Sequence, residues 1–252
     1  MNKIPISLEI NPSLFLRDPQ QTELGRRILQ QAILLIDELG LEQFTFRKLA
    51  ERIESTEASV YRYFENKHLL FVYLLNWYWE WMRFRVDYNT HNLASPVERL
   101  RMAITMIVDT AKRNTDVAFV DEDVLHRIVV TEGTKAYHHK MVDEENRIGF
   151  FLSYKNLCQQ IADLILEIDR AFPYPRALAS TLLEMANNHL YFAQHLPRLT
   201  DLREDEGHLP EQVTALLEHF AFSLLGVSQP STQALPARIQ SPPDDRHSGG
   251  CH

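Results

Sequence analysis

Glycine, proline and cysteine are scarce in most of this sequence, and each scarcity excludes a class of protein. Glycine accounts for 8 of 252 residues, against a usual share of about 7%. No proline lies between Pro19 and Pro96 or between Pro96 and Pro173, so long helices are expected. The only cysteines, Cys158 and Cys251, are too few for a disulfide framework or a thiolate metal cage.

Long apolar runs are also missing. No stretch reaches the roughly 18 consecutive apolar residues that a membrane-spanning helix requires. The first twelve residues, MNKIPISLEINP, contain Glu9 and two prolines where a signal peptide would need an apolar segment. The sequence therefore predicts a cytoplasmic protein with no membrane partner.

The charge balance and the absent motifs narrow the function further. With 26 Lys and Arg against 34 Asp and Glu, the net charge is -8, which argues against a globally basic protein that coats nucleic acid. Any nucleic-acid site must therefore be local. The sequence lacks GxGxxG, GxxxxGK[ST], GxSxG and HExxH, so no enzyme activity and no cofactor are expected.

Apolar residues recur at helical spacing along most of the chain, and no segment has the pattern of a strand. The fold class is therefore predicted to be all-α. Thr45, Ser55 or Thr56, Asn66 and Ser95 are expected to cap helices. The expected helices cover residues 22–39, 46–53, 57–64, 67–89, 95–113, 116–131, 143–170, 174–195 and 209–226.

The helix boundaries and changes in composition divide the chain into four parts. Residues 1–21 are an N-terminal arm with alternating apolar residues, and 22–68 form a three-helix domain. Residues 69–226 form a helical domain for regulation and dimerisation, which the long fourth helix joins to the first domain. Residues 227–252 contain four prolines and no periodic apolar face, so they are expected to be a disordered tail.

The helices expected at 46–53 and 57–64 are separated by three residues, which is typical of a helix-turn-helix that binds the DNA major groove. The surrounding run ILLIDELGLEQFTFRKLAERIESTEASVYRYFENKHLL resembles the N-terminal domain of TetR/AcrR-type transcriptional regulators over about residues 22–75. The matching features are Leu39-Gly40, Thr45, Lys48-Leu49-Ala50, Val60-Tyr61-Arg62-Tyr63-Phe64 and Asn66-Lys67.

This resemblance implies a ligand-responsive transcriptional regulator, most often a repressor, that binds a palindromic double-stranded DNA operator as a homodimer. It also implies that Tyr61 contacts a phosphate and that Tyr63 faces the groove. Lys67 begins a helix whose N-terminus suits an anion, so a phosphate clamp is expected there. The full set of expected DNA contacts is Thr45, Arg47, Lys48, Glu57, Ser59, Tyr61, Arg62, Tyr63 and Lys67.

Two features depart from the family pattern. Where such turns usually carry glycine and then an apolar residue, this chain has Glu54 and Ser55, so a left-handed non-glycine residue or a different path is expected. Residues 20–70 also contain seven basic and eight acidic side chains. These features favour an alternative from another class, a helical small-molecule-binding or protein-interaction protein that no longer reads DNA.

The second domain carries the candidates for ligand binding and dimerisation. An effector pocket with aromatic walls is expected, suited to an unidentified small molecule that is apolar or aromatic. The dimer is expected to form through residues 174–195 and 209–226, with Leu178, Leu182, Met185, His189, Val213, Leu216, Leu217 and Phe220 facing the partner. The expected pocket residues are Trp77, Tyr78, Trp81, Phe119, Phe151, Tyr154 and Tyr191.

Core packing of the aromatic run is an equal alternative to a pocket wall. Histidines and carboxylates also recur in the second domain, at Asp121, Glu122, Asp123, His126 and the pair His138-His139. Their spacing matches no known ligand pattern, so a solvated polar face is favoured over a metal site and no metal is expected.

Overall fold

The computed structural model describes residues 7–109, 119–204 and 207–227. Within these ranges the chain contains α-helices and short 3-10 turns and no strand, which confirms the all-α prediction. The helices are α1 (Glu23–Gln43), α2 (Phe46–Arg52), α3 (Glu57–Tyr61), α4 (Lys67–Thr90), α5 (Pro96–Val108), α6 (Glu122–Glu132), α7 (Val142–Arg147), α8 (Leu152–Ile168), α9 (Pro175–His195) and α10 (Leu209–Leu224).

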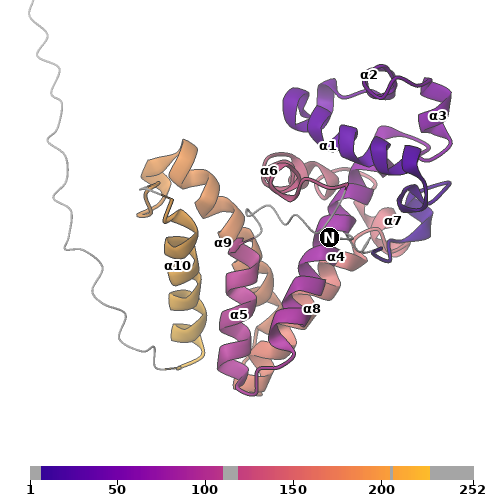
Figure 1. The fold of residues 1–252 in the computed structure, drawn as a ribbon. Coiled ribbons are helices and arrows are strands. Elements are labelled where there is room, and N and C mark those ends of the chain that lie inside the picture. The colour runs from indigo at the N-terminus through magenta and orange to yellow at the C-terminus, as the bar shows by residue number, and fades with distance from the viewer. Residues whose placement is uncertain (1–6, 110–118, 205–206, 228–252) are drawn as a thin grey trace, which may run out of the picture.

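The helices form two lobes that α4 connects (Figure 1). Helices α1 to α3 form the helix-turn-helix lobe around the first turns of α4. In the regulatory lobe α5 and α8 pack along the rest of α4, and α9 and α10 pack against α5 and α8 on the side away from α4, while α6 packs beneath α1. Helix α4 therefore passes from one lobe into the other without a break.

Several helix boundaries differ from the sequence prediction. The helix expected to end at residue 39 continues to Gln43 across a kink at Gly40, where φ is +75°. The helix expected at 143–170 is two helices, α7 and α8, because Gly149 adopts φ +87° between them. The helix expected from residue 116 begins at Glu122, after the N-cap Asp121. Helix α3 ends at Tyr61 rather than near residue 64. The predicted ends near 113 and 116 and the predicted tail after 227 lie outside the described residues.

The described part of the N-terminal arm, residues 7–21, packs against the body in two 3-10 turns, Pro12–Leu14 and Pro19–Gln21. Leu14 is fully buried. The buried Gln20 side chain holds the arm together, because its amide accepts from Leu8 N and donates to Leu8 O. The arm is therefore a structural part of the helix-turn-helix lobe.

Helix α4 is buried on all sides through its central part, residues 70–82. The sequence predicts this, since apolar residues occupy neighbouring faces of the same helix. Asn76 and Glu80 are buried with them. In the described ranges, no helix combines the length and hydropathy needed to cross a membrane.

Candidate DNA-binding and effector sites

Side-chain caps set the ends of the two short helices in the helix-turn-helix. The Thr45 hydroxyl accepts a hydrogen bond from Lys48 N at 3.2 Å at the start of α2. The Thr56 hydroxyl accepts from Ser59 N at 3.3 Å and lies 2.9 Å from the Ser59 hydroxyl at the start of α3. Such caps satisfy backbone N–H groups that have no partner inside the helix. Thr45 therefore fixes the start of α2, and Thr56 with Ser59 fixes the start of α3, the recognition helix of the motif.

The turn between these helices contains the left-handed residue that the sequence predicts. Glu54 has φ +51° and is the non-glycine residue with positive φ in the described ranges. Ser55 N donates to Ala50 O at 2.9 Å and closes the turn. A side chain in this conformation costs roughly 1–2 kcal/mol relative to ordinary backbone geometry.

Helix α3 presents its polar residues outward on an apolar base. Val60 is fully buried, whereas Glu57 and Arg62 are exposed and Tyr61 retains 46% of its surface. The Tyr61 ring packs edge-on against Phe46 with centroids 5.0 Å apart, so the ring is held in place although the side chain is exposed. This arrangement suits contact with a nucleic-acid backbone.

The basic side chains of this lobe differ in how strongly they are engaged. Arg52 donates to both Glu38 oxygens, at 2.5 and 2.7 Å. These hydrogen bonds hold the pKa of the Glu38 carboxyl below its usual range. Arg47 forms an exposed ion pair with Glu51 at 3.1 Å. In contrast, Arg62 makes no hydrogen bond or ion pair with another described residue, so it remains available to a phosphate.

Tyr63 does not face the groove, and that prediction is wrong. Its ring is 1% exposed, and its hydroxyl lies 2.8 Å from the Thr22 hydroxyl inside the lobe. The Arg17 guanidinium lies over the same ring, 5.5 Å from its centroid, and Leu16 N donates to Tyr63 O. Arg17 is therefore an exposed cation beside the recognition helix, which sequence spacing could not reveal.

Lys67 occupies a different position from the one expected for a phosphate clamp. Its ammonium donates to the carbonyl oxygens of Leu41, Glu42 and Phe44 at 3.0, 3.1 and 3.2 Å. These carbonyls close the C-terminal end of α1, where backbone acceptors have no helical partner and a cation is favoured. Lys67 therefore fastens α4 to α1, and Lys48 makes a similar contact with Gln43 O at 2.9 Å.

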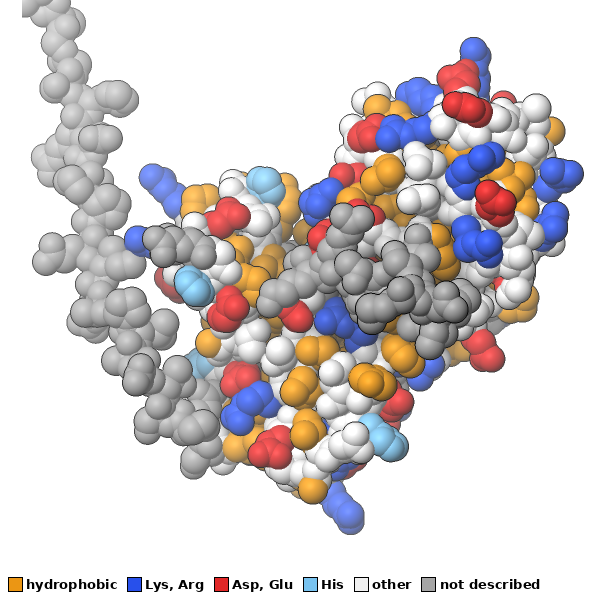
Figure 2. All heavy atoms as spheres, viewed as in Figure 1, with side chains coloured by type: hydrophobic (Ala, Val, Ile, Leu, Met, Phe, Trp, Pro, Cys, Tyr) orange, Lys and Arg blue, Asp and Glu red, His pale blue; other side chains and the backbone are white. Residues whose placement is uncertain are grey.

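Figure 2 shows that Lys and Arg side chains gather over the helix-turn-helix lobe, with Asp and Glu side chains between them. Basic and acidic side chains are therefore mixed on this surface, as the counts of the two kinds in residues 20–70 predict. Affinity for a polyanion must depend on which cations are free of carboxylate partners.

The expected pocket residues separate into two groups. Trp77, Trp81 and Phe119 are buried and pack on one another, with ring centroids 6.0 Å apart for the tryptophans and 6.3 Å for Trp77 and Phe119. Tyr78 is also buried, and its hydroxyl lies 2.8 Å from His126 Nδ1. None of these four rings lines either of the two pockets described below, so they act as core side chains.

The remaining expected residues do line open pockets. Phe151 and Tyr154 border a pocket of about 770 Å³ together with Tyr137, and the cationic side chains Lys155 and Arg176 lie at the same pocket. Tyr191 borders a second pocket of about 410 Å³ between α1, α6 and α9. The predicted single cavity is therefore replaced by two separate ones.

Helix α6 carries two buried ionisable groups where a solvated face was expected. Glu122 is 4% exposed and His126 is 5% exposed, so the prediction is wrong for these two residues. Burial raises the pKa of the Glu122 carboxyl to about 7, although the nearby Trp81 indole and Arg85 guanidinium favour its charged form. Burial also lowers the pKa of His126 to about 4, and the adjacent Arg127 adds to this effect.

Comparisons with known proteins identify the fold. Residues 28–74 match the model of the bacterial regulatory proteins of the tetR family, and no curated protein matches the sequence. AibR, solved with isovaleryl coenzyme A and operator DNA, is 18% identical with a TM-score of 0.54, and the match covers 77% of this chain and 97% of AibR.

Two further solved structures have the same fold. The fatty acid degradation regulator FadR from Bacillus halodurans is 17% identical over 79% of this chain and 93% of its own, with a TM-score of 0.55. The ketosteroid regulator KstR2 of Mycobacterium tuberculosis is 16% identical over 81% and 96%, with a TM-score of 0.53. The similarity therefore extends through both lobes.

Proposed function

We propose that this chain, whose helix-turn-helix lobe is of the tetR family of bacterial regulatory proteins, is a transcriptional repressor that binds a palindromic operator as a homodimer. The observation that carries this proposal is the presentation of α3. Its capped start and buried Val60 fix the helix, while Tyr61 and Arg62 remain exposed and Arg17 lies over the ring of Tyr63, which follows them in sequence. The family match covers this same segment.

A DNA-binding measurement tests the proposal. Fluorescence anisotropy with duplexes selected from a random pool should give salt-dependent binding. Arg62→Ala should weaken binding to all duplexes and reduce the slope of log affinity against log salt by about 1 per protomer. Tyr61→Phe should weaken binding without unfolding the lobe.

Arg198→Ala is the matched control, because it removes the same charge from an exposed site in the regulatory lobe. It should leave the affinity nearly unchanged. If Arg62→Ala and Arg198→Ala had equal effects, or if no duplex bound, the chain would instead be a small-molecule-binding or protein-interaction protein that does not read DNA.

The homodimer is proposed to form through α9 and α10, with a smaller set of residues than the sequence suggests. Leu178, Leu182, Val213 and Leu217 are buried within the chain, so they cannot face a partner as predicted. Phe220 and Leu224 remain 45% and 59% exposed on α10, and exposed apolar side chains of this kind favour association. Phe220→Glu with Leu224→Glu should yield a folded monomer by sedimentation velocity, and an unchanged dimer would contradict this interface.

The effector is proposed to bind the pocket lined by Tyr137, Phe151 and Tyr154. Its aromatic wall suits an apolar body, and Lys155 and Arg176 suit an anionic group. The structure of AibR with isovaleryl coenzyme A supports a ligand of this amphipathic kind. Fatty acids and short acyl-coenzyme A esters should raise the melting temperature of the wild type, and Arg176→Ala should reduce that shift.

A further inference from the structure

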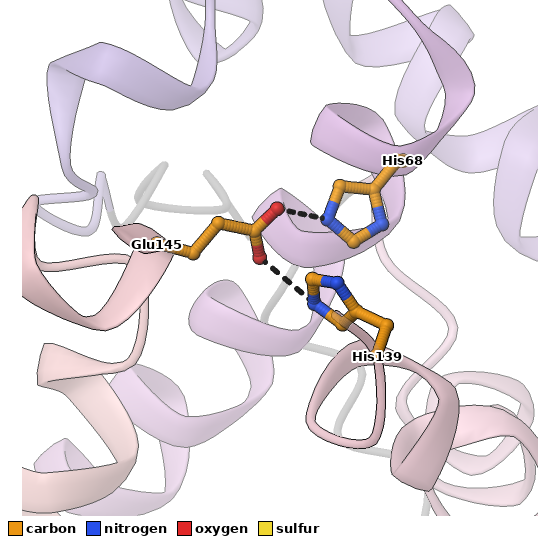
Figure 3. A group of neighbouring side chains, drawn as sticks. All are labelled: His68, His139 and Glu145. Atoms are coloured by element: carbon orange, nitrogen blue, oxygen red, sulfur yellow. Dashed lines mark hydrogen bonds and ion pairs between the residues drawn. The ribbon is translucent and has the colours of Figure 1, made fainter. Parts of the chain in front are cut away.

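Two histidines and a glutamate from three separate segments converge beside the first turn of α4 (Figure 3). His68 is the second residue of α4, His139 lies in the turn before α7, and Glu145 is on α7. His68 Nε2 is 2.8 Å from Glu145 Oε1, and His139 Nε2 is 3.1 Å from Glu145 Oε2. Each carboxylate oxygen therefore faces one imidazole nitrogen.

Within this group, Glu145 Oε2 has the ion-pair contact with His139 Nε2 but no hydrogen bond. Glu145 Oε2 is buried and accepts no hydrogen bond within the described residues. The nearby His139 Nε2–H donates to Ala136 O at 3.1 Å instead. A buried carboxylate oxygen without a hydrogen bond is costly, so a cation between the oxygen and the imidazoles would relieve this cost.

We propose that His68, His139 and Glu145 form a binding site for a divalent transition-metal ion of the zinc class. Two imidazole nitrogens and one carboxylate form a donor set that Zn²⁺ and Co²⁺ favour. One ligand atom from each residue lies within 4.8 Å of the others. The side chains of His68 and His139 are 36% and 24% exposed, so water can reach the site and supply a fourth ligand.

Metal binding requires a small local rearrangement. The donor atoms must move to about 2.0–2.2 Å from the ion. The His139 proton must also move from Nε2 to Nδ1, because a metal binds the deprotonated nitrogen. The contact from Met141 N to His139 Nδ1, now 3.3 Å, then has to lengthen. These shifts are confined to the three ligand side chains and the turn that carries His139.

The position of the site gives the metal a structural role between the lobes. His68 follows Lys67, whose ammonium holds the C-terminal carbonyls of α1. Glu145 belongs to α7, whose C-terminal neighbour Ile148 accepts a hydrogen bond from Asn11 of the N-terminal arm at 3.0 Å. A bound ion would therefore fasten the start of α4 to α7 at the joint between the lobes.

The test uses the full-length chain without a histidine tag. Co²⁺ titration should give the visible absorption of a nitrogen- and oxygen-ligated ion at one equivalent, and Zn²⁺ affinity is measured by competition with a chromophoric chelator. His139→Ala and Glu145→Gln should each lower the Zn²⁺ affinity at least tenfold. His138→Ala is the matched control, because His138 is adjacent and exposed, and it should keep the wild-type affinity.

A second readout guards against misfolded variants and against metal binding by His247, Cys251 and His252, which remain present in every variant. Zn²⁺ should raise the melting temperature of the wild type and of His138→Ala, and should not raise that of Glu145→Gln, which retains the shape of the side chain. Equal Zn²⁺ affinities and equal melting shifts in all four proteins would overturn the proposal. Neither readout involves DNA, so this result is independent of the proposed regulator function.

Discussion

The helix-turn-helix lobe keeps the polar side chains of α2 and α3 at or near the surface, whereas the centre of α4 and the facing side of α6 bury theirs. Tyr61 is 46% exposed, but Glu122 is 4% exposed and neither of its carboxyl oxygens accepts a hydrogen bond within the described residues. The Nε1 atoms of Trp77 and Trp81 are also buried without a hydrogen-bond partner there. The first region therefore exposes its polar side chains to water, while the second contains buried polar groups without hydrogen-bond partners among the described residues.

Ion pairs join these two regions. Arg127 of α6 donates to both Asp37 oxygens of α1, at 2.8 and 3.1 Å, and the nearby carboxylate raises the pKa of this arginine. Lys135 lies 3.7 Å from Glu42 and 2.7 Å from Glu132. A displacement of α6 would therefore act directly on α1, and this is a physical route by which the effector proposed above would affect the helix-turn-helix.

The largest expected effect tests whether the centre of α4 is solid core. Trp77→Ala should reduce the free energy of unfolding by about 3–5 kcal/mol, because the ring is almost fully buried. Tyr88→Ala, on the same helix but 72% exposed, should change it by less than about 0.5 kcal/mol. Urea denaturation measures both values. A cost below about 1 kcal/mol for Trp77→Ala would mean that this ring borders a cavity.

The next effect concerns the buried carboxyl of Glu122. Its pKa is raised from 4.5 to about 7 in the folded chain, so the folded state retains a proton that the unfolded state loses. The stability associated with this proton is present below about pH 4.5 and is lost as the pH rises towards 7. Glu122→Gln resembles the protonated acid, so its advantage over the wild type should be larger at pH 8 than at pH 5.

The difference between these two pH values should be at least about 1.4 kcal/mol, which corresponds to one pKa unit. A variant comparison is needed because His126, with a lowered pKa, loses stability in the opposite direction, as the pH falls below 6.5. Glu57→Gln, which changes an exposed acid of α3, is the control. If Glu122→Gln showed no larger pH dependence than Glu57→Gln, the two regions would not differ in the way the structure indicates.

The sequence predicts the helix starts well, because each cap depends on residues that are close together in the chain. The caps at Thr45, Thr56 and Asn66 each act within three residues, so they can be read from neighbouring positions. The helix break at Gly149 was missed, and there the arm contributes a contact from Asn11 to Ile148 O. That contact spans more than a hundred residues and leaves no local signature.

The difference between local and long-range contacts also explains which site residues the sequence predicts correctly. Val60 is the buried apolar residue of a short helix, so the exposure of Tyr61, one position further around the helix, can be inferred from spacing. The contacts of Lys67 with the end of α1, and the approach of His68 to Glu145, depend on how distant segments pack. Periodicity predicts which face of a helix is buried, but it does not identify the partner.

The smallest expected effect concerns the turn of the helix-turn-helix, where Glu54 has a strained, left-handed backbone conformation. Glu54→Gly should relieve the cost of a left-handed side chain and raise the free energy of unfolding by up to about 1 kcal/mol, since glycine also increases the entropy of the unfolded chain. Glu65→Gly is the control: this exposed residue of the same lobe does not have positive φ, so the same change should lower stability slightly. Glu54→Gln separates charge from conformation, because it keeps the strain and removes the carboxylate.

Thermal and urea unfolding of the three variants should rank Glu54→Gly above Glu54→Gln and Glu65→Gly. If Glu54→Gly were no more stable than Glu65→Gly, the left-handed turn would not be a source of strain.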